Sequence, residues 1–325
     1  MLYSVDVSYS VDKDSWDSKL LENASSTIYQ SYNWSEIYKN LYNSKPVFFI
    51  MKDEEGKVVA QLLSFIHSKY YWANSPLVIQ KINSLLNLGS ILFWWYGPVI
   101  HDQKNQLEII EKLFYSVESF ARKKKLFMIK GSFPPLLHFN DKSLLDKFQY
   151  NIIPWSTYII NLNQNSIDFF SKLDKKIRYD IRKAEDNNHI FIISNKREDL
   201  TEYGLIKDTY VKAIPKNNED SSRIFYDDHW NFLQKYGYEK LFRVLIKDKT
   251  ESAALVGIFN KNIVQHGVAS LKNDSKAGSF LTWNMIKWGM ESNYHILDLG
   301  GANPEPQSNK LSLIHISEPT RRRGI

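Results

Sequence analysis

One order of predicted elements occurs twice along the chain and constrains the fold more than any other feature. In the first half, β-prone runs at residues 47–51 and 57–66 flank an acidic turn that contains Gly56, which predicts a hairpin. A β-prone run at residues 91–96 precedes a stretch with apolar residues at helical spacing, and a short run at residues 126–129 follows it. The first half is therefore predicted to fold as hairpin, strand, helix, strand.

The second half repeats this order. Runs at residues 241–246 and 253–259 form the second predicted hairpin, and a strand at residues 263–271 follows. A helix with apolar residues three or four positions apart then leads to a strand at residues 296–299. Because a strand–helix–strand crossover makes its two strands parallel, each half is predicted to contain one parallel strand pair. We interpret the repetition as a duplication.

The predicted fold class is α/β (α+β mixed), with two tandem domains that each contain a mixed twisted sheet flanked by helices. A length of 325 residues and a hydrophobic content of 43% are sufficient for two cores. We assign residues 1–155 to the first domain, residues 156–310 to the second, and residues 311–325 to a tail of non-native origin.

The amino-acid content excludes several kinds of chemistry. The chain has no cysteine, which rules out a disulfide scaffold, a thiolate metal site and a cysteine nucleophile. The 42 Lys and Arg residues against 36 Asp and Glu permit a nucleic-acid, phosphate or anionic-membrane partner without requiring one. No secretory signal is visible at residues 1–12, and the longest apolar stretch, residues 85–100, is interrupted by Asn, Gly and Pro. We therefore expect a soluble, cytoplasmic protein.

Four short stretches carry a resemblance to a known family. They are Tyr-Gln-Ser-Tyr-Asn-Trp at residues 29–34, Tyr-Gly-Pro at residues 96–98, a strand and a basic helix at residues 157–184, and Asp-Leu-Gly-Gly-Ala-Asn-Pro at residues 298–304. Their order and spacing resemble those of the FemAB family, whose members contain two tandem acetyltransferase-like (GNAT) domains. The resemblance covers most of the chain.

The resemblance implies an enzyme that transfers an aminoacyl group from aminoacyl-tRNA to the amine of a peptidoglycan-precursor peptide. Because the donor ester is already activated, this reaction needs neither a metal nor a cofactor. It needs positioning of the two substrates and a hydrogen-bond donor or cation near the developing oxyanion. The implied partners are aminoacyl-tRNA and a muropeptide or lipid-linked precursor, with peripheral contact to the cytoplasmic face of the membrane.

Two other functions stay open. The first is an acyl-CoA-dependent N-acyltransferase of the GNAT type, acting in surface polysaccharide synthesis. Acetyl-CoA enzymes of this fold usually hold pyrophosphate with a Gln/Arg-x-x-Gly-x-Gly/Ala loop at a helix start. The equivalent loops here, residues 101–105 and 273–278, do not match this pattern, which argues against coenzyme A. The second alternative is a non-catalytic basic protein that binds RNA or a membrane.

A basic helix is predicted at residues 167–187. Its apolar stripe begins with Ile167, Phe170 and Leu173, and Ser166 is expected to cap its start. The opposite face is rich in Lys and Arg, which attract phosphates, although a solvated surface helix carries such charges as well. The resemblance favours contact with tRNA. The predicted tRNA- or phosphate-binding residues are Lys175, Arg178, Arg182 and Lys183.

The sequence offers few candidates for catalysis, since no Ser-His-Asp order, zinc signature or phosphate-binding loop is visible. His266 is either a core histidine or a base, and Asp298 either polarises a substrate amine or caps the Gly-Gly turn; the structural role is favoured for both. Two aromatic residues are candidates for stacking on substrate, with ordinary packing as the alternative, and two lysines are carried over from the family as phosphate ligands. The predicted substrate-binding residues are Trp34, Lys39, Tyr96 and Lys212.

The tail is treated separately from the fold. Residues 311–321 read Leu-Ser-Leu-Ile-His-Ile-Ser-Glu-Pro-Thr-Arg, which resembles the translation of a transposase-type sequencing adapter. A natural basic tail is the alternative. Our hypothesis is that the native sequence departs from the printed one near Lys310. In the FemAB family a Phe-Lys pair follows the Gly-Gly-x-x-Pro element, and its lysine is implied as the oxyanion cation. The printed sequence lacks this pair, so we expect weak activity and poor stability.

Overall fold

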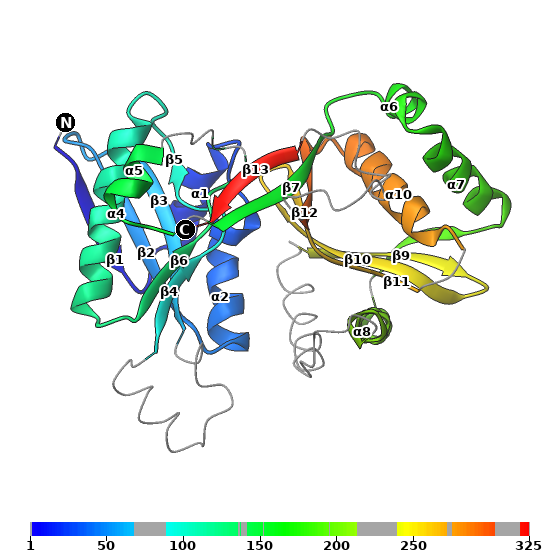
Figure 1. The fold of residues 1–325 in the computed structure, drawn as a ribbon, viewed down its shortest axis with the longest axis horizontal. Coiled ribbons are helices and arrows are strands. Elements are labelled where there is room, and N and C mark those ends of the chain that lie inside the picture. Colours follow the sequence, from blue (N-terminus) through cyan, green and yellow to red (C-terminus); the bar gives the residue numbers. More distant parts are fainter. Residues whose placement is uncertain are drawn as a thin grey trace, which may run out of the picture. The chain divides into compact units, whose positions relative to one another are not determined.

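The computed structural model of the chain consists of two compact units. It describes residues 2–67, 89–135, 137, 142–151, 153–194, 196–212, 239–271, 275–302 and 319–324. Unit 1 contains Met1–Trp155 and Arg321–Ile325, and unit 2 contains Ser156–Thr320. Each unit is built around one mixed sheet flanked by helices (Figure 1). The predicted fold class is therefore confirmed.

The sheet of unit 1 has the strand order β1-β2-β3-β4-β6, with β5 beside β3. The neighbouring strands are antiparallel except β4 and β6, which are parallel. The strands are β1 (Ser4–Ser8), β2 (Lys45–Lys52), β3 (Val58–His67), β4 (Ile91–Trp94), β5 (Val99–Ile100) and β6 (Met128–Gly131).

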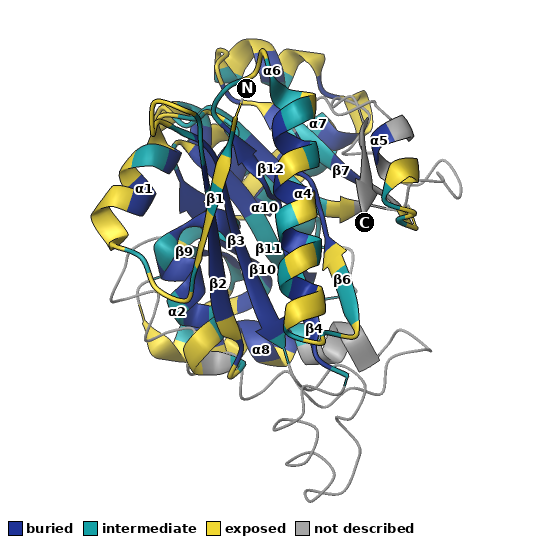
Figure 2. Ribbon diagram, turned by 90° about the vertical axis from the view of Figure 1, so that its left-hand side faces the viewer, coloured by how far each residue is buried: buried dark blue, intermediate teal, exposed yellow. Residues whose placement is uncertain are grey.

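Helices cover both faces of this sheet, so its central strands are buried (Figure 2). Phe49 on β2 packs in the core cluster that contains Phe114 of α4. Phe48, on the opposite face of β2, meets Trp16 of α1 with ring centroids 4.9 Å apart. The helical elements are α1 (Lys13–Leu21), the 3₁₀ turn η1 (Ile28–Gln30), α2 (Tyr32–Leu41), α4 (Gln106–Lys123) and α5 (Lys142–Lys147).

The second sheet, which belongs to unit 2 except for residues 153–155 of β7 and 321–324 of β13, has the strand order β13-β7-β12-β11-β10-β9-β8. Strands β11 and β12 are parallel, and β7 pairs antiparallel with β12. Residues 319–324 of the tail form β13 at one edge, while residues 311–318 lie outside the described residues. The strands are β7 (Ile153–Asn161), β8 (Ile190–Ser194), β9 (Glu239–Ile246), β10 (Lys249–Phe259), β11 (Asn262–Ser270), β12 (Ile296–Ala302) and β13 (Pro319–Gly324).

Helices α10 and α7 cover one face of this sheet, and α8 covers the other (Figure 1). The face beneath α10 carries the larger core, in which Ile177 and Ile181 of α7 pack with Leu281 of α10. The face beneath α8 carries a smaller core that includes Leu200 and Tyr203. The helices are α6 (Ser166–Lys172), α7 (Lys175–Asp186), α8 (Arg197–Lys212) and α10 (Ala277–Glu291).

The predicted repetition is present in the structure. The order β2, β3, β4, α4, β6 in unit 1 corresponds to β9, β10, β11, α10, β12 in unit 2, and each set ends in one parallel pair. Several boundaries differ by a few residues, and the largest difference is in β10, which begins at Lys249 and not at residue 253. Lys247 and Asp248 both have positive φ angles, 49° and 62°, so this hairpin turns within two residues.

The prediction of a single helix at residues 167–187 is wrong, because the chain forms α6 and α7 with a break between them. Leu173 and Asp174 are extended, and the Asp174 carboxylate caps α7 by accepting from the Lys176 amide at 2.7 Å. Asn165, and not Ser166, caps α6. The break rotates the first part of the predicted stripe, so that Ile167 is 76% exposed and Phe169 is buried.

Candidate functional site

Two of the stretches that carry the family resemblance meet at one buried side chain, Gln30. Its Nε2 donates to the carbonyl oxygens of Trp95 at 2.7 Å and Leu63 at 3.2 Å, and its Oε1 accepts from the Leu63 amide at 2.7 Å. A Cβ placed on Gly97 would approach Gln30 Nε2 to 2.7 Å. The glycine of Tyr-Gly-Pro is therefore required by the glutamine of the first stretch.

Trp34 and Tyr96 lie in a buried aromatic cluster around Tyr29. Trp34 is 6% exposed and Tyr96 is 1% exposed. Their ring centroids lie 5.0 Å and 4.7 Å from that of Tyr29, and both contacts are edge-on. The fold thus brings these two predicted binding residues together, and aromatic packing accounts for the position of each.

The two lysines carried over from the family are not brought together by any described contact. Lys39 on α2 is exposed, and its ammonium lies 3.6 Å from Glu36 one turn earlier. An exposed pair of this kind contributes little to stability. Lys212 is the last residue of α8, and its side chain lies outside the described part of the chain.

In unit 2, the parallel strands β11 and β12 pair over a short length and then separate. Beyond the last pair, β12 continues along β7, where Gly301 lies opposite Thr157. The Gln265 side chain spans the diverging strands, because its Nε2 donates to the Leu299 carbonyl at 3.0 Å. The paired residues are Asn262 with Ile296, Ile263 with Leu297, and Val264 with Asp298.

A β-bulge lies at this point of separation, and His266 is its inserted residue. On β10, Leu255 pairs with Gly267 and Val256 pairs with Gln265, which leaves His266 as the extra residue of β11. Bulges of this kind re-aim a side chain and are frequent beside active sites. The diverging strands and the bulge together mark this end of β11 as the candidate site.

A buried glutamate orients His266. Glu239, the first residue of β9, places Oε1 3.1 Å from His266 Nδ1, and the two side chains are 2% and 11% exposed. An ionised carboxylate in this position holds the proton on Nδ1 and leaves the lone pair on Nε2. The favoured prediction for His266 was a core histidine with one hydrogen bond. The observed pair fits that role, and it equally provides a base with its orienting group.

Helix α8 brings a hydroxyl and an ammonium group to the bulge. A Cβ on Gly267 would meet Tyr203 Oη at 2.6 Å, so the glycine leaves room for this hydroxyl, and Lys207 Nζ would lie 3.5 Å from the same position. Glu239 lies two residues before Leu241 on β9, and residues two apart on a strand point to the same face. Because Leu241 packs against α8, the Glu239 carboxylate points to the face that α8 covers. Glu239, His266, Tyr203 and Lys207 therefore share the face that α8 covers.

A buried arginine fixes α8 in this position. Arg243 on β9 is 5% exposed and forms ion pairs with Asp199 and Glu202 in the first turns of α8, the latter at 2.5 Å. Its Nη2 also donates to Thr250 Oγ1 at 2.6 Å. Because its charged groups are paired and hydrogen-bonded, this network holds α8 rigidly against the sheet. Its Glu202 lies one residue before Tyr203.

Asp298 organises the backbone at the Gly-Gly element of β12. Its Oδ1 accepts from the Gly300 amide at 2.9 Å and from the Thr157 hydroxyl, and the residue is 2% exposed. Gly300 has a φ of 82°, and a Cβ there would lie 3.1 Å from the Gln265 carbonyl oxygen. These contacts fit the predicted turn-capping role of Asp298.

The predicted phosphate-binding residues all lie on α7, opposite its buried stripe. Lys175, Arg182 and Lys183 are exposed, with Arg182 over the Phe170 ring at 5.8 Å and Lys183 over the Tyr179 ring at 5.9 Å. Arg178 instead donates to the Ser171 carbonyl at the end of α6. Three of the four cations are thus presented to solvent, and the fourth holds the α6–α7 junction.

The two helices that follow the central strands begin differently. At the start of α4, the Asp102 carboxylate accepts from Asn105 Nδ2 at 2.8 Å, a hydrogen bond that lowers the pKa of Asp102 and keeps a negative charge there. At the start of α10, Lys276 adopts a left-handed conformation, and its ammonium lies 3.7 Å from Asp180. A helix start favours anions, so α10 is the better phosphate site of the two. Residues 273 and 274 of its loop lie outside the described residues.

No group of three or more His, Asp or Glu side chains in the part of the chain that the structure describes is arranged to hold a metal ion. None of the described helices combines the length and apolar character needed to cross a bilayer.

The sequence named His266 as a candidate, with a structural role favoured, and gave no indication of Glu239, Tyr203 or Lys207. Glu239 stands 27 residues before its partner and just ahead of the predicted strand, so no local pattern connects them. Tyr203 and Lys207 are one helical turn apart, which is a spacing that many surface helices share. Only Gly267, an isolated glycine within a strand pattern, indicated a bulge or a close approach.

No protein-family model and no curated protein sequence matches the chain. Solved structures share its fold. The crystal structure of FemX is 12% identical, with 99% of this chain and 97% of that one covered and a TM-score of 0.72. The C-terminal domain of a putative lysylphosphatidylglycerol synthetase from Agrobacterium fabrum is 10% identical, covering 95% and 91%, with a TM-score of 0.53. A tandem GNAT protein from the clavulanic acid pathway is 9% identical, covering 100% and 98%, with a TM-score of 0.57. The chain therefore has a FemAB-like tandem GNAT fold.

Proposed function

We propose that this protein is an acyltransferase that moves an aminoacyl group from aminoacyl-tRNA to the amine of a peptidoglycan-precursor peptide. The observation that carries the proposal is the likeness to FemX, which extends over both units with a TM-score of 0.72. The four sequence stretches that resemble the FemAB family support it. A cytoplasmic location belongs to the proposal, because aminoacyl-tRNA is a cytoplasmic donor.

In the proposed reaction, the acceptor amine attacks the ester carbonyl of the donor at the bulge of β11. A C–N bond forms, the bond from the carbonyl carbon to the ribose oxygen breaks, and one proton moves from the amine to that oxygen. His266 Nε2 accepts the proton while Glu239 stabilises the charged imidazole. The Lys207 ammonium, beside Gly267, provides positive charge for the oxyanion.

A transfer assay tests the reaction itself. The protein is incubated with charged tRNA, prepared separately for each amino acid, and with a nucleotide-linked or lipid-linked muropeptide. We expect the mass of the acceptor to rise by one aminoacyl residue with at least one donor. Absence of transfer from every charged tRNA, by a protein that binds tRNA, would favour the non-catalytic alternative.

Substitutions in the Glu239–His266 pair test the roles of these residues. His266→Asn is expected to lower kcat by roughly 100-fold or more, as is typical for loss of a general base. Glu239→Gln keeps the size of the side chain and is expected to lower kcat by about tenfold. His295→Asn is the matched control, because His295 precedes the paired end of β12, away from the bulge. Unchanged kcat in His266→Asn would exclude the base role.

The exposed cations of α7 support tRNA as the donor, since clustered Lys and Arg side chains attract a phosphate backbone. Lys175→Glu with Lys183→Glu is the sharper test, because Arg178 also holds the α6–α7 junction. We expect tRNA affinity to fall at least tenfold and the slope of log K against log salt to flatten by about two. Lys249→Glu with Lys261→Glu makes the same charge change at the two exposed ends of β10 in unit 2 and is the control. Affinity that is insensitive to salt would contradict a phosphate-based site.

An acyl-CoA donor is the second candidate, favoured by the start of α10. Lys276 brings a positive charge to the start of this helix, where the Ala277 amide donates to Ser275 Oγ at 3.4 Å, and a helix start attracts anions. The fold neighbours also include a GCN5-related N-acetyltransferase from Sphaerobacter thermophilus, 9% identical with a TM-score of 0.50. Calorimetry with acetyl-CoA distinguishes the candidates. Binding that Lys276→Glu abolishes, together with acetyl transfer to an amino sugar, would replace tRNA as the donor.

A further inference from the structure

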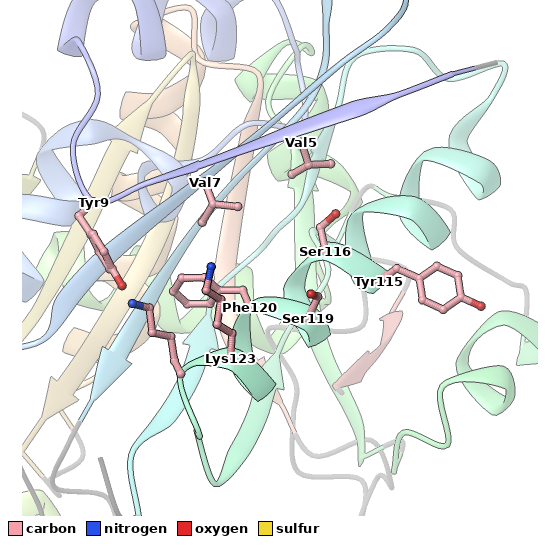
Figure 3. Close-up of a pocket in the computed structure, with 9 residues that line it drawn as sticks. Val5, Val7, Tyr9, Tyr115, Ser116, Ser119, Phe120 and Lys123 are labelled. Atoms are coloured by element: carbon pink, nitrogen blue, oxygen red, sulfur yellow. The ribbon is translucent and has the colours of Figure 1, made fainter. Parts of the chain in front are cut away.

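A groove on unit 1, between the edge strand β1 and helix α4, belongs to none of the features used above. Its volume is about 510 Å³, within the range of small-ligand sites. Figure 3 shows Val5 and Val7 on β1 facing Ser116, Ser119 and Phe120 on α4 across it. One wall is therefore apolar, and the other combines an aromatic ring with two hydroxyl groups.

Lysines give one end of the groove a positive charge. Lys123 and Lys124, at the end of α4, are part of its lining, and no acidic side chain is among the residues that line it. Tyr9 stands at the same end, with the Lys124 ammonium 5.6 Å and the Lys45 ammonium 3.7 Å from its ring centroid. Two ammonium groups beside one ring repel each other, and a bound anion would relieve that repulsion.

Two acidic groups near the groove pair with other cations. Asp6, on the opposite face of β1, pairs with Lys52 at 2.8 Å. Glu118 on α4 pairs with Arg122 at 3.3 Å.

Exposed apolar side chains surround the lysines. Val7 is 41% exposed, Tyr9 is 37% exposed, and Phe127, three residues after Lys124, is 64% exposed. A free phosphate or a sugar phosphate gains nothing from these groups. A bilayer surface does, because it offers phosphate at the depth of the lysines and hydrocarbon beneath it. Aromatic and basic residues together are typical of such an interface.

We propose that this groove binds the phosphate headgroup of an anionic phospholipid, so that unit 1 contacts a membrane surface through β1 and the end of α4. Lys123 and Lys124 contact the phosphate, Ser119 donates to a headgroup oxygen, and Val7 and Tyr9 reach the first acyl carbons. The interaction needs neither donor nor acceptor, so it is independent of the proposed acyl transfer.

Vesicle sedimentation tests this surface. We expect the protein to bind vesicles that contain phosphatidylglycerol and to leave vesicles of phosphatidylcholine alone in the supernatant. Lys123→Ala with Lys124→Ala is expected to weaken binding roughly tenfold or more. Lys249→Ala with Lys261→Ala, at the two exposed ends of β10 in unit 2, is the matched control and is expected to retain binding.

A neutral substitution separates the groove from charge alone. Ser119 is exposed, so Ser119→Gln occupies part of the groove without changing its charge or adding an aromatic ring. We expect it to weaken vesicle binding as well, with an unchanged melting temperature. The proposal is overturned by three results: no binding to anionic vesicles, equal losses in the control pair, or full competition by soluble glycerol phosphate. The last result would identify a soluble phosphate ligand instead.

Discussion

At the scale of single residues, the side chain of Gln30 joins segments that lie far apart in the sequence. Its amide contacts the backbone of Leu63 on β3 and of Trp95 after β4, and Gly97 packs directly against it. Gln30 uses both the donor and the acceptor of its side-chain amide in a buried position. No other side chain of this length offers the same two groups, so none can replace it without losing a hydrogen bond. This explains why Gln and Gly occur together in the stretches that resemble the FemAB family.

Replacing Gln30 by Ala is expected to lower the free energy of unfolding by about 2–4 kcal/mol, because the Leu63 amide and Trp95 carbonyl lose buried partners. Urea denaturation measures the change. Gln103→Ala is the control, since its Nε2 makes one hydrogen bond, to the Ile100 carbonyl at 2.8 Å, and we expect a loss of about 1 kcal/mol. Equal losses in the two variants would contradict the role assigned to Gln30.

His101 predicts a dependence of stability on pH. Burial, aided by Lys19, lowers the pKa of His101 from 6.5 to about 4, while its Nε2 lies 3.0 Å from Gln61 Oε1. The unfolded chain therefore binds a proton at a higher pH than the folded chain. Its contribution is fully present above pH 6.5 and is lost as the pH falls towards about 4.

We expect this loss to be about 1–2 kcal/mol after discounting for the partial exposure of the ring. Urea denaturation of the wild type and of His101→Gln is compared from neutral pH to about pH 4. The difference between the two proteins isolates the contribution of His101 from that of other titrating groups. The variant should lose less stability on acidification. Parallel curves for the two proteins would show that His101 does not titrate in this way.

At the scale of elements, the predicted and the observed secondary structure differ at the junction between α6 and α7. The apolar spacing at residues 167–187 fits one helix, yet Asp174 begins a second one because its carboxylate accepts from the Lys176 amide. Asp competes with the helix backbone for hydrogen bonds and is therefore favoured at caps. Periodicity predicted which residues of α7 are buried, but it could not decide between an Asp within a helix and an Asp that caps one.

Asp174→Ala is expected to destabilise unit 2 by about 1 kcal/mol, the usual contribution of an N-cap. Asp174→Asn should retain most of this contribution, because Asn caps equally well. Asp168→Ala, in the first turn of α6, serves as a control for loss of a carboxylate at a non-capping position. Chemical denaturation measures all three. If Asn and Ala are equally destabilising, the effect depends on charge and not on capping.

At the scale of the whole molecule, the two units contain separate cores. The cluster around Leu113 and Phe114 draws its residues from unit 1, and the cluster around Ile181 and Leu281 draws its residues from unit 2. Contacts within a core determine the stability of that core. Each unit is therefore expected to respond to substitutions in its own core.

Leu113→Ala and Ile181→Ala test this separation, because both side chains are fully buried. Each substitution is expected to cost about 2–5 kcal/mol, through lost burial and a cavity. Hydrogen exchange followed by mass spectrometry should show faster exchange in unit 1 for the first variant and in unit 2 for the second. Faster exchange throughout the chain in both variants would instead indicate one cooperative structure.

The sequence by itself determined the order of elements, the duplication, the parallel pair in each half and the buried stripe of α7. These features depend on spacings of two to four residues, and such spacings are visible in a linear chain. Only the tertiary structure decided that Glu239 meets His266, that Gln30 requires Gly97, and that α8 brings Tyr203 and Lys207 to the bulge. Each of these contacts depends on strand register and helix docking, and these are fixed by the packing of residues distant in sequence, which no local pattern records.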